Sequence, residues 1–318
     1  MPLNIKQNIP LAPYTTLKIG GPADYFVDVS TPDEIIMALM WAKKNKVPFY
    51  ILGNGSNVLI SDAGFRGLII HIKNTHFDIQ GTTAVADAGV SLPILAKETT
   101  KKGLSGLEFF IGVPGSVGGA VYGNAGAFEQ ETKNMLLSVR ALLPRVDFEI
   151  YFVQQSMCSI VSTYTTDPEE TIVLATISSN ACEFSYRESI FKKHKNWIIV
   201  QATFDLVVET AQECLERMEK MLTQKTDTQP MGTKAAGSIF KNPDGKHAWE
   251  LIVDAEMQGF TIGGAQVSGT HANYIINVGN ATAEHFMMLI ALIKQRVRVR
   301  CGVQLQEEIQ FVGFDNPL

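Results

Sequence analysis

The stretch GVPGSVGGAVYGNAGAF, residues 112–128, constrains the fold more than any other part of this sequence. It holds six glycines and three alanines among seventeen residues and carries no charged side chain. Glycine loses more backbone freedom on folding than other residues, so such a run is kept where the missing side chains are needed. The stretch therefore indicates either a sharply turning loop under a neighbouring sheet or a backbone that approaches a bulky ligand closely.

A second glycine-bearing loop, GNGSN at residues 53–57, follows the apolar segment VPFYIL. Both loops offer small side chains, backbone N–H groups and a serine hydroxyl, and successive amides in such turns form concave sites for anions. Neither loop matches the P-loop or a G-x-G-x-x-G motif that opens a helix. Either loop alone is more often a simple turn, but two of them favour a long cofactor with a pyrophosphate.

The charge balance argues against several classes of partner. The chain of 318 residues has 27 Lys plus Arg and 32 Asp plus Glu, a net charge of −5, which gives no electrostatic reason to expect nucleic acid or an anionic membrane. No apolar run is long enough to cross a bilayer, and the N-terminus lacks the apolar core of a signal peptide, so we expect a cytoplasmic protein. The four cysteines are widely separated, without a C-x-x-C pair, which favours free thiols over disulfides or a metal site.

Local signals for helices and strands follow one another along the chain, which indicates an α/β or α+β fold. Capping residues and apolar spacing predict helices over residues 30–46, 91–103, 210–225 and 281–302. Strands are predicted at residues 149–155, 170–178 and 197–208, and the polar segment 161–171 is predicted to be a loop. The main domain boundary is expected around residues 205–225.

Several polar residues are candidates for chemistry, each with a structural alternative. Ser238 in AAGSIFKNP lacks the G-x-S-x-G spacing of a hydrolase nucleophile, and it is either a turn residue or a proton donor. Arg187 in FSYRES either pairs with an acid or binds a carboxylate or enolate oxygen. Glu307 and Glu308 in LQEEIQFVG would point to opposite faces of a strand. His271 in THANYIIN is more often a hydrogen-bonded packing residue than a catalytic one.

In this order, the segments resemble one family, the bacterial UDP-N-acetylenolpyruvoylglucosamine reductases. The resemblance covers nearly the whole chain and rests on the blocks NIPLAPYTTLKIGGPADYF, ILGNGSNVLISDAGFRGLII, GLSGLEFFIGVPGSVGGAVYGNAGAF, FSYRESIF, AAGSIFKNP, GGAQVSGTHANYIINVGNATAEH and GVQLQEEIQFVG. It implies an α+β chain with an FAD-binding domain of the vanillyl-alcohol-oxidase (PCMH) type. That domain would have subdomains at residues 1–80 and 81–208, and an α+β substrate-binding domain would follow at residues 209–318.

The resemblance also implies roles for individual residues. Arg187 matches the arginine of the family's Y-R-x-S motif, Ser238 matches its proton-donating serine, and Glu308 matches the second glutamate of its closing block. Lys241 and Asn242 are implied substrate contacts, and no metal is implied. The residues that match the family's FAD-binding loops are Gly53, Asn54, Gly55, Ser56, Asn57, Pro114, Gly115, Ser116, Gly118, Gly119, Asn124, Gly126 and Ala127.

The implied reaction has two stages. NADPH would reduce bound FAD, and the flavin would then reduce UDP-N-acetylglucosamine enolpyruvate to UDP-N-acetylmuramate, a peptidoglycan precursor, while Arg187 stabilises the enolate and Ser238 protonates it. The implied partners are thus FAD, NADPH and the enolpyruvyl substrate, and we expect a monomer. The alternative is another FAD-dependent oxidoreductase on the same scaffold, acting on alcohols or 2-hydroxy acids.

The chain departs from the family pattern in three places. Tyr14 stands where asparagine is usual, and Gln306 replaces the first glutamate of the closing block. Residues 139–186 are also longer than the family needs between the glycine-rich block and Y-R-x-S. We expect the excess to form a surface insertion or an extended hairpin.

Overall fold

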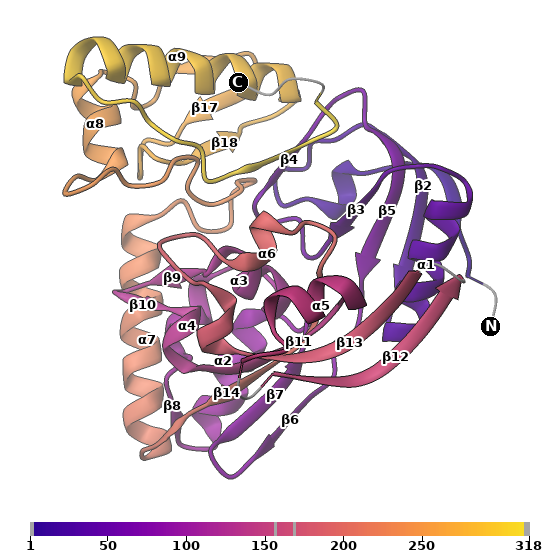
Figure 1. The fold of residues 1–318 in the computed structure, drawn as a ribbon. Coiled ribbons are helices and arrows are strands. Elements are labelled where there is room, and N and C mark those ends of the chain that lie inside the picture. The colour runs from indigo at the N-terminus through magenta and orange to yellow at the C-terminus, as the bar shows by residue number, and fades with distance from the viewer. Residues whose placement is uncertain (1–2, 156–157, 168–169, 315–318) are drawn as a thin grey trace. The chain divides into compact units, whose positions relative to one another are not determined.

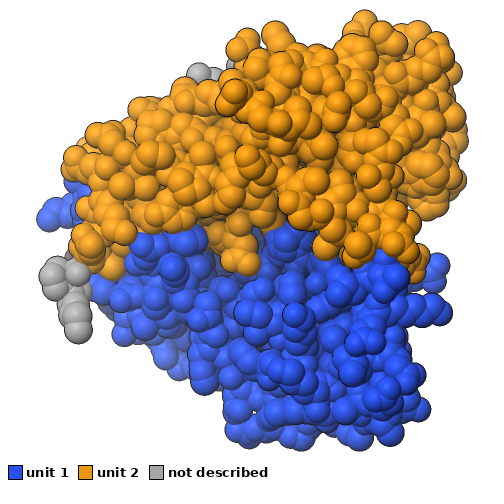
Figure 2. Space-filling model, turned by 180° about the vertical axis from the view of Figure 1, so that it is seen from behind, with its two compact units in different colours: residues 1, 28–45, 70–223 blue, residues 2–27, 46–69, 224–318 orange. Residues whose placement is uncertain are grey.

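The computed structural model describes residues 3–155, 158–167 and 170–314 of the chain. The chain divides into two compact units, which are coloured separately in Figure 2. The first unit contains Asp28–Asn45 and Ile70–Thr223, and the second contains Pro2–Val27, Lys46–Ile69 and Gln224–Leu318. Each unit is therefore made of segments that are distant in the sequence.

The first unit is built on an antiparallel six-stranded sheet with the order β12–β13–β11–β14–β7–β6 (Figure 1). Its strands are β6 (Phe77–Gln80), β7 (Thr83–Asp87), β11 (Leu136–Pro144), β12 (Ser159–Asp167), β13 (Glu170–Ser178) and β14 (Ile198–Asp205). Short strands pair nearby: β8 (Leu104–Ser105) with β15 (Val207–Val208), and β9 (Gly126–Ala127) with β10 (Gln130–Glu131).

The helices of the first unit follow the capping signals of the sequence. They are α1 (Pro32–Lys44), α2 (Leu92–Lys101), η2 (Glu108–Gly112), α3 (Val117–Gly123), α4 (Thr132–Met135), α5 (Arg145–Tyr151), η3 (Ser179–Cys182) and α6 (Ile190–Lys193). The predicted helices over residues 30–46 and 91–103 are thus confirmed as α1 and α2. The Thr31 side chain caps α1 by accepting a hydrogen bond from the Glu34 N–H at 3.2 Å.

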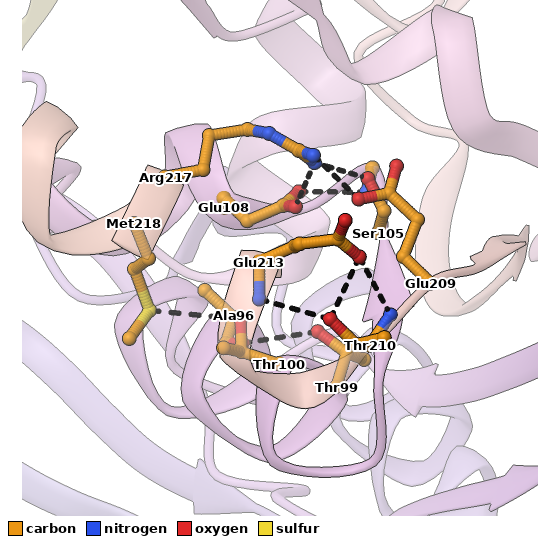
Figure 3. A network of polar contacts seen from close by, with 11 residues as sticks. Ala96, Thr99, Thr100, Ser105, Glu108, Glu209, Thr210, Glu213, Arg217 and Met218 are labelled. Carbon is orange, nitrogen blue, oxygen red and sulfur yellow. Dashed lines mark hydrogen bonds and ion pairs between the residues drawn. The ribbon is translucent and has the colours of Figure 1, made fainter. Parts of the chain in front are cut away.

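Helix α7 (Ala211–Thr228) begins in the first unit and ends in the second. The helix predicted over residues 210–225 is confirmed. Leu215, Met218 and Leu222 recur at helical spacing along it, but only Met218 is buried, and Leu215 and Leu222 are half-exposed. Arg217 anchors α7 instead, because its guanidinium contacts the buried carboxylate of Glu108 at 2.6 Å and Glu209 at 2.5 Å (Figure 3). The same guanidinium donates a hydrogen bond to the Ser105 hydroxyl at 2.6 Å.

The second unit combines strands from both ends of the chain. One sheet has the order β1–β2–β5–β3, and another has the order β16–β17–β18. The short helix η1 (Ala12–Tyr14) lies between β1 and β2 in the chain. The strands are β1 (Lys6–Pro10), β2 (Pro22–Val29), β3 (Phe49–Leu52), β4 (Val58–Ile60), β5 (Phe65–Ile72), β16 (Thr261–Ile262), β17 (Ala265–Val267), β18 (Ile275–Asn277) and β19 (Gln310–Val312), and the ends of β2 and β5 run into the first unit. Strand β19 pairs in parallel with β4.

Two helices pack with the C-terminal strands of the second unit. Helix α9 (Ala283–Cys301) contacts α8 (Ala248–Asp254), β16 and β17 (Figure 1). The helix predicted over residues 281–302 is confirmed as α9, and the apolar residues at helical spacing along it are fully buried: Phe286, Leu289, Ile290, Ile293 and Val297. Gly302 ends α9 in the left-handed conformation with φ +68°, as its position predicted.

One hydrophobic core in the second unit joins residues from both ends of the chain. Leu17, Ile19 and Leu59 are buried in the same cluster as Phe286 and Leu289 of α9. The division into domains at residues 1–80, 81–208 and 209–318 stays a prediction. The contacts nonetheless give the N-terminal segments and the C-terminal region a shared core.

Two predicted elements were wrong. Residues 149–155 were expected to be a strand, but α5 ends at Tyr151, and Phe148 and Phe152 lie on one side of it with ring centroids 5.9 Å apart. Residues 161–171 were expected to be a loop, but β12 runs to Asp167 and pairs antiparallel with β13; Pro168 and Glu169 lie outside the described residues. The long segment before Arg187 thus contains a hairpin, one of the two forms expected for it.

Candidate cofactor and catalytic site

The first glycine loop, residues 53–57, follows β3 and is fixed by the N-terminal segment. Gly55 has φ +60°, and a Cβ atom there would lie 2.1 Å from the Tyr14 carbonyl oxygen. The Gly55 carbonyl oxygen accepts a hydrogen bond from the Thr16 N–H at 3.0 Å. Glycine is therefore required at residue 55 by the protein's own backbone.

This loop also presents donors that the chain does not use. Within the described residues, none of the backbone N–H groups from Asn54 to Asn57 donates a hydrogen bond to the protein. The Asn57 Oδ1 atom is buried and lacks a hydrogen-bond partner in the same part of the chain. Unsatisfied amides in succession form an anion-binding concavity, so the loop fits a phosphate group and a neighbouring donor.

The second loop, residues 112–119, differs because its amides are mostly used within the protein. The Val117 N–H donates to the Val90 carbonyl at 2.9 Å, and the Gly118 N–H donates to the Ala88 carbonyl at 2.8 Å. The Gly119 N–H donates to the Ser116 hydroxyl at 3.4 Å, which caps α3. A Cβ atom at Gly118 would lie 2.9 Å from the Cβ of Ala88, so this glycine lets α3 approach a neighbouring segment.

Two other glycines of the same stretch have room for a Cβ atom. A Cβ atom at Gly123 would meet no atom within 4 Å, and one at Gly119 would meet the Ser116 hydroxyl oxygen at 3.5 Å. The protein itself therefore does not require glycine at these two positions. Both are places where a ligand could lie against the backbone, whereas Gly118 has a packing role.

The end of the glycine-rich stretch is attached to the segment that carries Arg187. Asn124, fully buried and left-handed with φ +43°, donates from Nδ2 to the Ser185 carbonyl at 2.9 Å and to Glu131 at 3.1 Å. Its Oδ1 accepts from the Lys133 N–H at 3.1 Å, so its side chain is used in holding the loop. Ala127 follows on β9.

Arg187 contacts this stretch directly. Its Nη2 atom donates a hydrogen bond to the Gly126 carbonyl oxygen at 3.1 Å, and its guanidinium carbon lies 5.0 Å from the centre of the half-exposed Tyr186 ring. A Cβ atom at Gly126 would lie 2.5 Å from the Gln130 carbonyl oxygen and 3.2 Å from Nη1, so the backbone of β10 requires glycine there, and the guanidinium also lies close. Arg187 has φ +58°, a strained conformation for a non-glycine residue, and such strain is typical of functional positions.

A tyrosine of the glycine-rich stretch lies near the same segment. The Ser189 hydroxyl donates to the Tyr122 carbonyl oxygen at 2.7 Å. Burial, and to a lesser degree the charge of Glu188, raises the pKa of the Tyr122 hydroxyl above its usual value. Tyr122 therefore keeps its proton at neutral pH, and sequence reasoning did not single it out.

Ser238 lies in a segment of the second unit that Asn273 holds from the side. The Asn273 carbonyl accepts from the Ile239 N–H at 2.8 Å, and its side-chain amide exchanges hydrogen bonds with the Phe240 N–H at 3.0 Å and the Phe240 carbonyl at 2.8 Å. Ser238 itself is half-buried and follows Gly237, which has φ +75°. Sequence reasoning missed Asn273, although it lies in the block that contains His271.

His271 takes the packing role that the sequence favoured. Its Nδ1 atom accepts a hydrogen bond from the Asn273 N–H at 3.3 Å, which requires an unprotonated nitrogen at that position. Burial lowers the pKa of His271 below its usual value of 6.5. The neutral imidazole thus supports the residue that holds the Ser238 segment.

Glu308 is held by both the first glycine loop and the Ser238 segment. Its N–H donates to the Ile239 carbonyl at 2.8 Å, and its carbonyl accepts from Asn57 Nδ2 at 3.1 Å and from Gln310 Nε2 at 3.2 Å. The structure therefore brings the first loop, Ser238 and Glu308 together along the backbone. A strand through Glu307 and Glu308 was predicted, but β19 begins only at Gln310.

Neighbouring polar residues have identified partners. Glu307 forms an ion pair with Lys294 of α9, whereas the backbone of Glu308 contacts the first loop and the residue after Ser238. The Lys241 N–H donates to the Gln306 carbonyl at 2.8 Å, and Asn242 Oδ1 accepts from the Ala248 N–H at 3.0 Å at the start of α8. Ser238, Lys241, Asn242, Glu308 and the first loop lie in the second unit, whereas Arg187 and the second loop lie in the first.

Two structural features are absent from the described residues. None of the helices is both long and apolar enough to span a membrane. Across the same residues, no group of three or more His, Cys, Asp or Glu side chains is arranged to hold a metal ion.

Two protein families match separate parts of the chain. Residues 23–146 match an FAD binding domain family, and residues 229–312 match the C-terminal domain of UDP-N-acetylenolpyruvoylglucosamine reductase. The expected α+β fold, with an FAD-binding domain followed by a C-terminal domain, is thus confirmed.

Full-length relatives lead to the same family. A UDP-N-acetylenolpyruvoylglucosamine reductase of Carboxydothermus hydrogenoformans is 39% identical over 311 residues, which cover 97% of this chain and 94% of the relative. One from Listeria monocytogenes is 37% identical, with 98% of this chain and 96% of the relative covered. The crystal structure of the reductase (MurB) from Thermus caldophilus is 29% identical, covers 98% of this chain and 100% of its own, and superposes with a TM-score of 0.77. The chain therefore belongs to the UDP-N-acetylenolpyruvoylglucosamine reductase family.

Proposed function

We propose that the protein uses NADPH and bound FAD to reduce UDP-N-acetylglucosamine enolpyruvate to UDP-N-acetylmuramate. One observation carries the proposal beyond family membership. A loop whose four backbone N–H groups from Asn54 to Asn57 donate to no group in the described part of the chain is bonded through Asn57 to the carbonyl of Glu308. The Glu308 N–H in turn donates to the residue next to Ser238. Hydrogen bonds thereby join the candidate anion site to the backbone of Glu308, and the backbone of Glu308 to that of the residue after Ser238.

The first loop, residues 53–57, is the proposed pyrophosphate site of FAD. Its free amides would donate to the phosphate oxygens, and the buried Asn57 Oδ1 would accept from a hydroxyl of the cofactor. Gly119 and Gly123, where the protein's own packing does not require glycine, are proposed as further cofactor-binding residues, together with Pro114, Gly115, Ser116 and Gly126. When FAD is bound, it supplies hydride transfer from NADPH to the enolpyruvyl β-carbon.

Arg187 is the proposed stabiliser of the enolate. Negative charge develops on the α-carbon and carboxylate of the enolpyruvyl group when its β-carbon accepts hydride, and a guanidinium fixed in place stabilises that charge. The bond to the Gly126 carbonyl and the contact with Tyr186 limit the motion of the guanidinium. Pre-orientation of this kind lowers the reorganisation needed during the reaction.

Ser238 is the proposed proton donor to the α-carbon, and Glu308 is proposed to assist it. The bond from the Glu308 N–H to the Ile239 carbonyl keeps the two residues in register, and Asn273 fixes the same segment from its other side. Lys241 and Asn242 are proposed to contact the substrate. A hydroxyl is a weak acid, so a neighbouring carboxylate is expected to tune proton transfer.

The test separates the two half-reactions by absorbance. The purified protein is expected to be yellow, to lose its flavin absorbance under NADPH without oxygen, and to regain it when UDP-N-acetylglucosamine enolpyruvate is added. Replacement of that substrate by alcohols or 2-hydroxy acids tests the alternative oxidoreductase. Failure of the enolpyruvyl substrate to reoxidise the flavin would overturn the proposal.

The Ser238→Ala variant locates the proton donor in the same experiment. Flavin reduction by NADPH should keep its wild-type rate, whereas reoxidation by the enolpyruvyl substrate should slow by roughly 10²- to 10⁴-fold, the usual contribution of a general acid. The matched control is Ser56→Ala in the first loop, which should alter FAD retention more than reoxidation. Equal loss of both half-reactions in Ser238→Ala would reject its role.

A further inference from the structure

Four aromatic side chains, His247, Trp249, His271 and Tyr274, form a row in the second unit, here termed the aromatic row. The ring centroids of His247 and Trp249 lie 6.5 Å apart with an interplanar angle of 22°, and those of Trp249 and His271 lie 6.3 Å apart. His271 and Tyr274 meet edge to face at 5.0 Å. The row therefore runs from the start of α8 to the turn that contains Asn273.

The aromatic row is attached at both ends to the Ser238 segment. On one side, Asn242 Oδ1 accepts from the Ala248 N–H and so fixes the first turn of α8, from which Trp249 projects. On the other side, His271 supports the N–H of Asn273, whose side chain and carbonyl hold the backbone of Ile239 and Phe240. His271 is thus linked to the hydrogen bonds that hold the backbone after Ser238, and Trp249 follows a helix start that Asn242 of the same segment fixes.

The row is rigid at one end and exposed at the other. The Tyr274 hydroxyl donates to Gln229 Oε1 at 2.9 Å, and His271 is half-buried. Trp249 leaves 41% of its surface exposed, and His247 is exposed as well. An exposed indole on a fixed support is an effective stacking surface, because little side-chain entropy is lost when a planar ring covers it.

Charges of both signs flank the exposed end in the sequence. Lys246 precedes His247 and is exposed, as are Asp244 and Glu250 on either side of it. A planar aromatic surface next to lysine matches the two parts of a nucleotide, a base and a charged phosphate. No feature of the proposed acid–base chemistry requires a tryptophan at residue 249.

We propose that the aromatic row is a stacking site for the ring of a nucleotide, with Trp249 as its main contact. This inference rests on the proposed function, whose substrates are a uridine nucleotide and a nicotinamide dinucleotide. The site assigns a binding role to residues outside the proposed catalytic group. It would hold the nucleotide end of a ligand whose reacting group lies near Ser238.

The test measures nucleotide binding to the FAD-loaded protein by titration calorimetry, with UDP and NADP⁺ as separate probes. Trp249→Ala is expected to weaken binding of UDP by roughly 5- to 100-fold, the range of one base–aromatic stack. Trp249→Phe keeps a ring and should lose much less. Glu250→Ala, an exposed neighbour on the same helix, serves as the matched control and should bind both probes as the wild type does.

The outcomes show separately whether the stacking site exists and which of the two nucleotides binds there. Loss of NADP⁺ binding with UDP binding intact would support the stacking site and assign it to the dinucleotide. Wild-type affinity of Trp249→Ala for both probes would overturn the inference. Flavin reduction and reoxidation are measured on the unsubstituted protein, so failure of the proposed function would be seen independently of any result at Trp249.

Discussion

The imidazole of His271 shows how a single residue couples protonation to the shape of the candidate site. Its Nδ1 accepts from the Asn273 N–H, and Asn273 in turn holds the backbone that follows Ser238. Protonation of Nδ1 would replace an acceptor by a donor and break this contact. The neutral form is therefore the one that the folded protein stabilises.

The pH dependence of stability tests this role of His271. Because burial lowers the folded-state pKa of His271 below 6.5, its contribution is fully present above pH 6.5 and is lost as pH falls through the lowered pKa. His271→Phe should cost about 1 kcal/mol of unfolding free energy at pH 8, the net contribution of one hydrogen bond. That difference should shrink towards pH 5.5 in urea titrations. A difference that stays constant over this range would contradict the role.

The sequence pointed to candidate site residues, but it did not predict which other residues they contact. Glu307 and Glu308 are adjacent and identical in type, and a period-two strand cannot tell which one enters a site. The ion pair of Glu307 with Lys294 and the backbone contacts of Glu308 with Asn57 and Ile239 separate them. These partners lie far away in the sequence, so no local pattern contains them.

At the scale of elements, α7 is anchored by charge more than by its apolar face. Glu108 is 3% exposed and accepts from the Gly106 N–H at 2.6 Å, while Arg217 neutralises it from α7 (Figure 3). A buried carboxylate that loses its charged partner is strongly destabilising, even though such a pair contributes little compared with an apolar one. Arg217 is therefore the critical residue for the position of this helix.

Arg217→Met tests this anchor. We expect a loss of about 3 kcal/mol in unfolding free energy, at the low end of the usual cost because the guanidinium is partly exposed and screened. The control, Lys101→Ala, removes the exposed pair with Glu98 and should cost less than about 1 kcal/mol. Urea unfolding followed by circular dichroism measures both. Equal effects of the two variants would show that burial of Glu108 is unimportant.

The elements that were wrongly predicted share a physical cause. Residues 149–155 are rich in β-branched and aromatic residues, which favours a strand. Instead, helix α5 runs to Tyr151, and the ring of Phe152 after it packs against Trp197 with the ring centroids 5.3 Å apart. The polar β12 becomes a strand because β13 supplies its hydrogen bonds. In both cases a contact with a residue or strand that is distant in the sequence outweighs the intrinsic propensity of the segment for helix, strand or loop.

For the whole molecule, the shared core of the second unit makes a prediction about independent folding. A fragment of residues 209–318 lacks Leu17, Ile19 and Leu59, which are buried against α9 and its neighbours, and lacks β4, the partner of β19. Each of these buried side chains contributes about 1.5–3 kcal/mol. We expect the fragment to show no cooperative unfolding and poorly dispersed amide resonances, in contrast with the full chain. A well-dispersed spectrum would establish residues 209–318 as an autonomous domain.

By itself, the sequence determined where the helices with clear caps lie and which residues resemble those of one family. It also lacks the motifs of several other classes of protein, such as the P-loop. These features are local, because caps, periodicity and motifs depend on neighbours along the chain. The tertiary structure decided what the glycines of residues 112–128 are for. Gly118 admits Ala88 and Gly126 admits the Gln130 carbonyl, whereas Gly123 faces open space and Gly119 has room for a Cβ atom in ordinary contact with Ser116. It also decided that Asn57 joins the first loop to Glu308, a contact between residues 251 positions apart that only chain folding can create.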